Sequence, residues 1–137
     1  MFRTGDALGV THFYLSGFTP APLDRFGRIV KELAKTALGA EQSIPWESLE
    51  QPLPILARLK HEGFIVIAIE QDAKAIDYKT YIAPEKVLVV VGSEVEGVPS
   101  ELSKECDVIV EIPMQGKKES LNVSVAFGVA LFRILGQ

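Results

Sequence analysis

Hydrophobic and polar positions alternate along the chain in two different spacings, and these predict strands separated by helices. Continuous apolar runs occupy residues 64–69 and 87–91, and both are rich in β-branched side chains. Such runs are typical of parallel strands that are buried on both faces. Shorter strands are predicted over residues 12–16 and over residues 108–112, where Glu111 interrupts the apolar run.

Helical spacing separates these strands. Apolar side chains recur every three or four positions over residues 24–38, and Asp24 is the expected N-cap. A second helix is predicted over residues 54–62, and a third over residues 120–135 with Ser120 as its N-cap. The alternation of strands and helices predicts an α/β fold, with a mostly parallel sheet and helices on both of its faces.

Two segments follow this pattern less well. Residues 43–53 contain prolines and are predicted to form a loop. The chain opens with a short predicted helix over residues 4–9 and has no strand before it. Parallel α/β domains usually begin with a strand, so this opening is unusual.

Composition narrows the class of protein. The chain has 137 residues, of which 47% are hydrophobic and 23% are charged, which fits a single globular domain over residues 1–137 and excludes intrinsic disorder. The apolar runs are far shorter than the roughly 20 residues that cross a bilayer, and the N-terminus lacks a signal-peptide pattern. Cys106 is the only cysteine, which excludes an intramolecular disulfide. A cytoplasmic protein without membrane association is therefore expected.

The net charge of −4 argues against nonspecific binding of nucleic acids, although it permits a local basic patch. Four basic residues, Arg25, Arg28, Lys31 and Lys35, fall on the helix predicted over residues 24–38. They form either an ordinary solvated helix face or a surface that binds phosphates.

Three loops follow predicted strands and are candidates for a ligand site. They cover residues 70–72, 92–99 and 113–119. In an open parallel sheet, ligands bind beyond the carboxyl ends of the strands. All three loops are therefore expected to contribute to one pocket.

The loop over residues 92–99 is the most informative of the three. Gly92 and Gly97 allow unusual backbone angles and a close approach to a ligand. Glu94 and Glu96 favour a cationic or hydroxyl-rich ligand, whereas a phosphate would require basic groups and helix amides. The alternative is a tight turn with solvated carboxylates.

Other kinds of chemistry find less support in the sequence. Asn122 is expected in the first turn of the last helix, where its amide serves either a ligand or helix capping alone. His12 and His61 belong to no recognisable catalytic arrangement, and Cys106 is expected to be a buried structural thiol. No metal-binding motif is present, so a metal is not implied.

Three segments in order resemble motifs two and three of the SpoU/TrmH-type RNA 2′-O-ribose methyltransferases of the SPOUT superfamily. They are Gly-Ser-Glu-Val-Glu-Gly-Val-Pro over 92–99, Ile-Pro-Met over 112–114 and Ser-Leu-Asn-Val-Ser-Val-Ala over 120–126. Residues 2–10 resemble the second half of motif one, and residues 35–41 are also similar to family members. The resemblance covers nearly the whole chain.

The resemblance implies a fold and an activity. Family members have an α/β domain whose C-terminal segment is threaded into a trefoil knot, an exception to the rule that chains are unknotted. They bind S-adenosylmethionine, act as homodimers with the active site at the subunit interface, and need no metal. They transfer the methyl group to a ribose 2′-hydroxyl in tRNA or rRNA.

The resemblance also assigns residues to roles. The cofactor site is expected to comprise Glu70, Gly92, Glu94, Ile112, Met114, Ser120 and Leu121, with backbone groups of Gly92, Ile112 and Leu121 binding the adenosine. The catalytic positions are Arg3, Glu94, Ser120 and Asn122. The RNA-binding candidates are Arg3, Arg25, Arg28, Lys31, Lys35, Lys117 and Lys118. A guanidinium stays protonated, so Arg3 is expected to grip a phosphate and orient the ribose hydroxyl.

The sequence departs from the family at its start. The Asn and the strand that open motif one are missing before Arg3, so a domain truncated at its N-terminus is expected. Because chain ends fray, we expect Arg3 to be loosely held. The alternative function is a non-catalytic module that binds S-adenosylmethionine or RNA. A weaker alternative is an unrelated flavodoxin-like or other nucleotide-binding α/β domain.

Overall fold

The computed structural model describes residues 1–17, 19 and 21–137, and the chain packs into two compact units. Unit 1 spans Met1–Pro52 and unit 2 spans Leu53–Gln137. Each unit has a parallel sheet and helices, which confirms the predicted α/β class. The boundaries of one domain over residues 1–137 stay a prediction.

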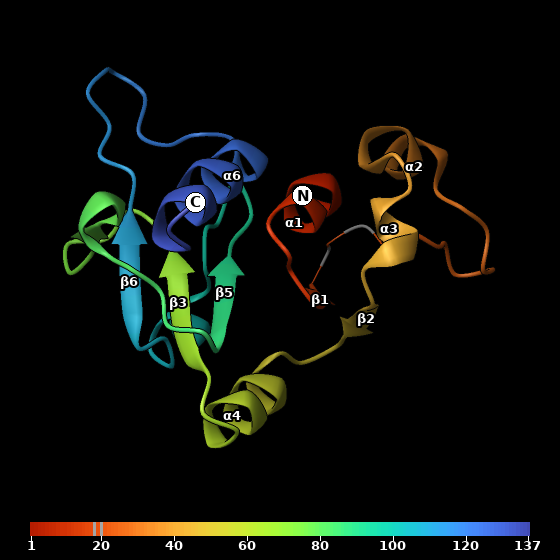
Figure 1. The fold of residues 1–137 in the computed structure, drawn as a ribbon, viewed down its shortest axis with the longest axis horizontal. Helices are drawn as coiled ribbons and strands as arrows, with labels where there is room; N and C mark the ends of the chain where they lie inside the picture. The colour runs from red at the N-terminus through yellow and green to blue at the C-terminus, as the bar shows by residue number, and fades with distance from the viewer. Residues whose placement is uncertain (18, 20) are drawn as a thin grey trace. The chain divides into compact units, whose positions relative to one another are not determined.

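The described residues of unit 1 form a pair of parallel strands and three short helices, which are labelled in Figure 1. Its elements are α1 (Phe2–Ala7), β1 (Phe13–Ser16), α2 (Lys31–Ala37), α3 (Ala40–Ser43) and β2 (Trp46–Leu49). Phe13 lies opposite Trp46, and Ser16 lies opposite Leu49. The prediction of a loop over residues 43–53 is therefore wrong, because β2 lies within it. The four residues of β2 show no alternation of buried and exposed positions, so pairing with β1 defines this strand.

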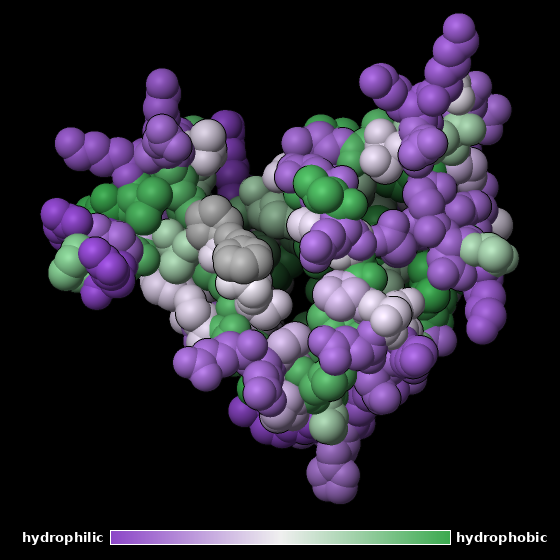
Figure 2. All heavy atoms as spheres, turned by 180° about the vertical axis from the view of Figure 1, so that it is seen from behind, coloured by the Kyte–Doolittle hydropathy of each residue, from purple (hydrophilic) through white to green (hydrophobic). Residues whose placement is uncertain are grey.

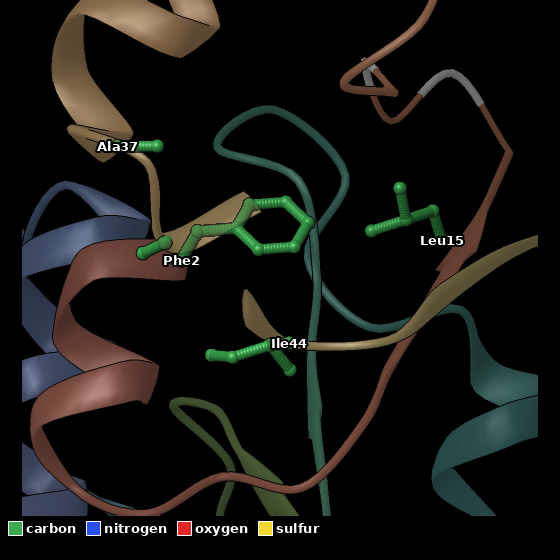
Figure 3. Packing of buried hydrophobic residues seen from close by; sticks show 5 residues of the cluster. Phe2, Leu15, Ala37 and Ile44 are labelled. Carbon is green, nitrogen blue, oxygen red and sulfur yellow. The ribbon is translucent and has the colours of Figure 1, made fainter. Parts of the chain in front are cut away.

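The core of unit 1 holds the first helix firmly (Figure 3). It consists of the buried residues Phe2, Leu15, Ala37, Ala40 and Ile44. The ring centroids of Phe2 and Phe13 are 4.5 Å apart. A Cβ atom added at Gly5 would come within 2.7 Å of the Phe13 ring, so α1 packs closely on β1. Phe2, the residue before Arg3, is buried in this core, whereas Arg3 itself is exposed, so the loose hold on Arg3 stays a prediction.

The helix predicted over residues 24–38 is shorter than expected. A turn replaces its first part, because Asp24 Oδ1 accepts hydrogen bonds from the backbone N–H of Phe26 at 2.8 Å and of Arg28 at 2.9 Å. Leu23 and Ile29 then form an antiparallel bridge across this turn. Such local bonds from an aspartate compete with helix formation. The prediction that Asp24 caps the helix is therefore wrong.

This change also separates the four bases predicted on one helix. Only Lys31 and Lys35 lie on α2, whereas Arg25 and Arg28 lie in the preceding turn. The predicted continuous basic helix face is consequently wrong.

Unit 2 is built on a four-stranded sheet in the order β4–β6–β3–β5, and every strand pair is parallel (Figure 1). Its elements are α4 (Leu53–His61), β3 (Ile65–Ile69), β4 (Ile76–Asp77), the 3-10 helix η1 (Tyr78–Thr80), β5 (Val87–Val91), α5 (Ser100–Ser103), β6 (Val108–Glu111) and α6 (Val123–Ile134). The strands predicted over 64–69, 87–91 and 108–112 are confirmed. The register places the carboxyl ends of β3, β5 and β6 at one edge of the sheet.

Helices cover both faces of this sheet. Val66 and Ala68 pack with Leu56 of α4 and Leu102 of α5. Side chains alternate along a strand, so the fully buried Ile67 points to the opposite face, where α6 crosses (Figure 1). Across the described residues, every helix is too short or too polar to cross a lipid bilayer.

Asp107 joins three elements at the opposite edge of the sheet, just before β6 begins. Its carboxylate accepts a hydrogen bond from Val66 N at 2.8 Å and lies 3.0 Å from Lys60 Nζ of α4. Burial acts to raise the pKa of this carboxyl, but the bond from Val66 and the Lys60 ammonium outweigh it and lower the pKa. Asp107 thus fixes the starts of β3 and β6 against α4.

Candidate functional site

A cavity of about 800 Å³ lies at the carboxyl edge of the unit 2 sheet. The three loops that follow β3, β5 and β6 all line it, as predicted. Its volume is in the range of roughly 300–1,000 Å³ that is usual for pockets that bind small molecules. The three loops meet at one cavity because the parallel register places the ends of β3, β5 and β6 side by side.

The predicted cofactor residues come together in this cavity. All seven line it, although they derive from separate segments of the sequence: Glu70, Gly92, Glu94, Ile112, Met114, Ser120 and Leu121. Asn122 is not a lining residue, but its neighbours on both sides are. The strand-end site and the cofactor residues, both predicted from the sequence, thus lie at the same place.

Gly92 is required by the backbone of the loop itself. A Cβ atom at Gly92 would lie 1.9 Å from the carbonyl carbon of Gly97 and 2.2 Å from Val98 N. Ser93 and Gly97 pair across the loop, and Gly97 N donates to Ser93 O at 3.0 Å. We expected glycine here for close approach to a ligand, whereas the observed close approach is between the two limbs of the loop.

Glu70 ties this loop to the end of β3. Its Oε2 accepts a hydrogen bond from Val98 N at 2.8 Å, and its Oε1 accepts one from Gln71 N at 2.8 Å. Gly97 adopts a positive φ of 65°, and a side chain there would collide with Glu70 Oε2. The carboxylate therefore shapes the cavity wall, with its remaining lone pairs available to a ligand.

Asn122 is the N-cap of α6, and this corrects the prediction that Ser120 caps the last helix. Asn122 Oδ1 accepts from Ser124 N at 2.9 Å and from Val125 N at 3.4 Å. The cap leaves its Nδ2 free to donate to Glu94 Oε1 at 3.5 Å. Two predicted catalytic residues, 28 positions apart in the sequence, are thereby brought together.

The cavity is acidic. Its lining carries five carboxylates and one basic group: Glu70, Asp72, Glu94, Glu96 and Glu119 against Lys104. Apolar side chains also line it, namely Ile69, Val95, Val98, Ile112, Met114, Leu121, Val123 and Ala126. This lining fits S-adenosylmethionine, because the carboxylates complement its cationic sulfonium and ammonium groups while the apolar walls accommodate the adenine ring.

Gln71 is a site residue that sequence reasoning missed. Its Nε2 donates to the backbone carbonyl of Ile112 at 2.8 Å and so links the loops after β3 and β6. Backbone groups of Ile112 are expected to bind adenosine, and its carbonyl already accepts this hydrogen bond within the chain. The signal for Gln71 in the sequence was its position directly after Glu70 in a strand-end loop.

The predicted RNA-binding residues are distributed over both units. Arg3 is exposed on α1, and Lys117 and Lys118 are exposed in the loop after β6. Arg28 forms an ion pair with Asp24 at 2.8 Å. Within the described part of the chain, no group of three or more His, Cys, Asp or Glu side chains is placed to hold a metal ion.

Comparison with known proteins agrees with this architecture. Residues 1–132 match the SpoU rRNA Methylase family. The chain belongs to this family. A curated relative is the 23S rRNA (guanosine-2′-O-)-methyltransferase RlmB of Ralstonia nicotianae, which is 40% identical over 121 residues, covering 85% of this chain and 47% of the relative. The chain spans about half the length of several curated relatives, from 47% to 58%.

Two solved structures extend the similarity to three dimensions. The TrmH/SpoU tRNA modifying enzyme of A. aeolicus superimposes with a TM-score of 0.83 at 28% identity, covering 98% of this chain and 64% of that one. An AdoMet-bound rRNA methyltransferase from Sinorhizobium meliloti has a TM-score of 0.82 at 28% identity, covering 97% and 48%. Family membership excludes the unrelated flavodoxin-like interpretation.

Proposed function

We propose that this chain is the catalytic domain of an RNA methyltransferase that uses S-adenosylmethionine and modifies a ribose 2′-hydroxyl in tRNA or rRNA. The observation that carries the proposal is the convergence of all seven predicted cofactor residues on one acidic cavity. The names of the relatives support both the reaction and the two classes of RNA. A cytoplasmic location follows from these substrates.

The cofactor, when bound, would supply an electrophilic methyl group on a sulfonium. Glu94 places a carboxylate in the cavity, and Asn122 holds that carboxylate in position through its amide. The N-cap bonds of Asn122 fix the amide in turn, so α6 orients this part of the site. Ser120 contributes a hydroxyl to the lining. These residues bind and orient, and they require no metal.

Arg3 is proposed to hold the RNA rather than to remove a proton. Its guanidinium presents N–H donors in a planar fork, so it serves as a bidentate partner for a phosphate next to the reacting ribose. Water or an RNA phosphate oxygen would accept the proton of the hydroxyl. Arg25, Lys31 and Lys35 of unit 1, with Lys117 and Lys118 of unit 2, would add further phosphate contacts.

We also propose a homodimer and a C-terminal trefoil knot, as the family resemblance implies. Apolar atoms reach the surface in several places (Figure 2). On α6, Val125, Val129 and Phe132 are 51%, 41% and 45% exposed at helical spacing, so they form one apolar stripe. Covering such a stripe against a second copy removes it from water. A charged substitution, Val129→Glu, should shift the protein toward monomer in analytical ultracentrifugation.

The first test is calorimetric titration of the full chain with S-adenosylhomocysteine. Saturable binding is expected. Glu94→Gln should weaken it, whereas Glu101→Gln removes the same charge from α5 outside the cavity and should leave binding unchanged. Absence of binding by a folded protein would refute the proposal.

The second test is transfer of a labelled methyl group to tRNA and rRNA, followed by nuclease digestion and identification of the nucleosides. The proposal requires 2′-O-methylated ribose. Binding without transfer would support the non-catalytic alternative, and a methylated base would overturn the assignment of the ribose. If the basic residues contact phosphates, RNA affinity should fall steeply as salt is raised.

A further inference from the structure

The turn over residues 24–28 exposes an aromatic ring to solvent. Phe26 lies in the middle of this turn and is 65% exposed, although phenylalanine is usually buried. Leu23 and Ile29, which form a bridge across the turn, are 42% and 59% exposed. The proposed function assigns no role to these three apolar side chains. Exposed apolar groups beside charged residues commonly mark a binding surface.

Hydrogen bonds fix the backbone of this turn. Asp24 N donates to Arg28 O at 2.8 Å, and Gly27 N donates to Asp24 O at 2.9 Å. The Asp24 carboxylate accepts from Phe26 N and Arg28 N. Gly27 has a φ of 76°, a backbone conformation that favours glycine. The ring is therefore presented on a turn that is already formed, so a ligand that binds there loses little affinity to ordering the chain.

Two arginines flank the ring. The Cζ atoms of Arg25 and Arg28 lie 4.8 Å and 5.0 Å from the centroid of the Phe26 ring, within the range of cation–π contacts. Arg28 also donates from Nε to Asp24 Oδ2 at 2.8 Å, and its two terminal nitrogens take no part in that bond. No carboxylate of the described residues lies within ion-pair distance of Arg25. Both guanidiniums thus have N–H donors for a phosphate, while most of the ring remains open to solvent.

We propose that Phe26 is a stacking platform for an unpaired nucleotide of the RNA, with Arg25 and Arg28 contacting the neighbouring phosphates. RNA as the partner rests on the proposed function. Unpaired bases stack on aromatic rings and on guanidinium planes, whereas the bases of a duplex are covered by their neighbours. Every base has a flat face, so the platform accepts any base and selects single-stranded over double-stranded RNA.

Local charge supports RNA as the occupant. Residues 24–31 contain three basic residues and one acidic residue, a balance of 3 − 1 = +2, whereas the whole chain carries −4. A ring surrounded by positive charge matches a ligand that has flat apolar faces and a phosphate on every unit.

The first test measures binding of a fluorescein-labelled oligouridylate by fluorescence anisotropy, with saturating S-adenosylhomocysteine present so that the cavity of unit 2 is occupied. Phe26→Ala should weaken binding by roughly 5- to 100-fold, whereas Phe26→Trp should retain it. Ile82→Ala removes an apolar side chain that is 59% exposed in unit 2, and it is the matched control. The same strand annealed to oligoadenylate should lose little affinity with Phe26→Ala, and an equal loss for strand and duplex would overturn the selection of single strands.

Salt dependence separates stacking from a purely structural role of Phe26. The ring carries no charge, so Phe26→Ala should lower the affinity for oligouridylate without changing the slope of log affinity against log salt. Arg25→Ala should make that slope shallower by about 0.7, the value for one phosphate contact on a single strand. If Phe26 only held the arginines in place, Phe26→Ala would make the slope shallower as well, and the platform would be overturned.

Photocrosslinking locates the base directly. Under ultraviolet light, an oligouridylate that contains 5-iodouridine should form its crosslink with Phe26, which mass spectrometry of the digested protein identifies. A crosslink that bypasses Phe26, or unchanged affinity of Phe26→Ala, would contradict the proposal. A shift of Phe26→Ala toward monomer in analytical ultracentrifugation, with RNA affinity intact, would instead assign this turn to a second copy of the chain. Calorimetry with S-adenosylhomocysteine reports separately on the proposed function, since cofactor binding without oligouridylate binding would overturn the platform alone.

Discussion

Substituting alanine for Gly92 tests whether the loop over residues 92–99 has the closed shape that forms the cofactor cavity. The added Cβ would lie 1.9 Å from the carbonyl carbon of Gly97, and real Cβ contacts essentially never come below 3.0 Å. The two limbs would have to separate by about 1 Å, which is that difference. Because backbone atoms form the collision, a change of side-chain rotamer cannot relieve it.

The energetic cost follows from the bonds that separation would break. The Gly97 N–H donates to Ser93 O at 3.0 Å, and the Val98 N–H donates to the Glu70 carboxylate at 2.8 Å. A neutral hydrogen bond contributes about 1 kcal/mol and one to a charged group about 1.5–3 kcal/mol, so the loss is about 2.5–4 kcal/mol. If cofactor binding must reclose the loop, affinity for S-adenosylhomocysteine falls roughly 30-fold or more.

Two measurements check this prediction. Calorimetry gives the affinity for S-adenosylhomocysteine, and urea unfolding gives the change in the free energy of unfolding. Gly116→Ala is the matched control, since a Cβ there meets nothing within 4 Å and its φ is not positive. It should leave affinity unchanged and stability within about 1 kcal/mol. If Gly92→Ala bound the cofactor product as tightly as Gly116→Ala did, the reasoning about the closed loop would be refuted.

Four further outcomes are expected. Glu70→Gln should lower the free energy of unfolding by about 1–3 kcal/mol and weaken cofactor binding, because it weakens the charged link to Val98; unchanged values for both would contradict this role. Asn122→Ala should destabilise the chain by about 1 kcal/mol in thermal unfolding, whereas Asn122→Asp keeps a capping oxygen and should be milder. The pKa of the Asp107 carboxyl is lowered in the folded state. Its contribution to the free energy of unfolding is therefore full above the ordinary pKa of 3.8 and is lost as the pH falls through the folded-state pKa. Asp107→Asn should flatten the acid limb of a curve of stability against pH. Burial raises the pKa of Cys106 to about 11, so Ellman's reagent at pH 8 should react far more slowly with the native protein than with the urea-unfolded chain.

The strands of unit 2 could be predicted from their continuous apolar residues, although only β3 is largely buried and all five residues of β5, at the end of the sheet order, are half-buried. The apolar runs therefore identify two strands in the sequence, Ile65–Ile69 and Val87–Val91. β2 does not, since Trp46–Leu49 has no buried position in its pattern and depends on its partner strand. The helix over residues 24–38 was predicted too long because a single aspartate builds a turn at its start. Such local competition is not visible in hydrophobic spacing.

The sequence by itself determined the α/β class and the strand-end location of the cavity, and its resemblance to a known family indicated seven of the residues that line it. It did so because hydrophobic burial and motif spacing are properties of the chain in one dimension. Only the tertiary structure shows why those residues are needed. Gly92 leaves room for the opposite limb of its own loop, and Glu70 holds that loop through a hydrogen bond from Val98 N. Asn122 caps α6 and also donates a hydrogen bond to Glu94. It also revealed that the buried Oε2 of Glu41 has no hydrogen-bond partner among the described residues. The bonds from Val98 to Glu70 and from Asn122 to Glu94 each join residues 28 positions apart, which spacing cannot encode.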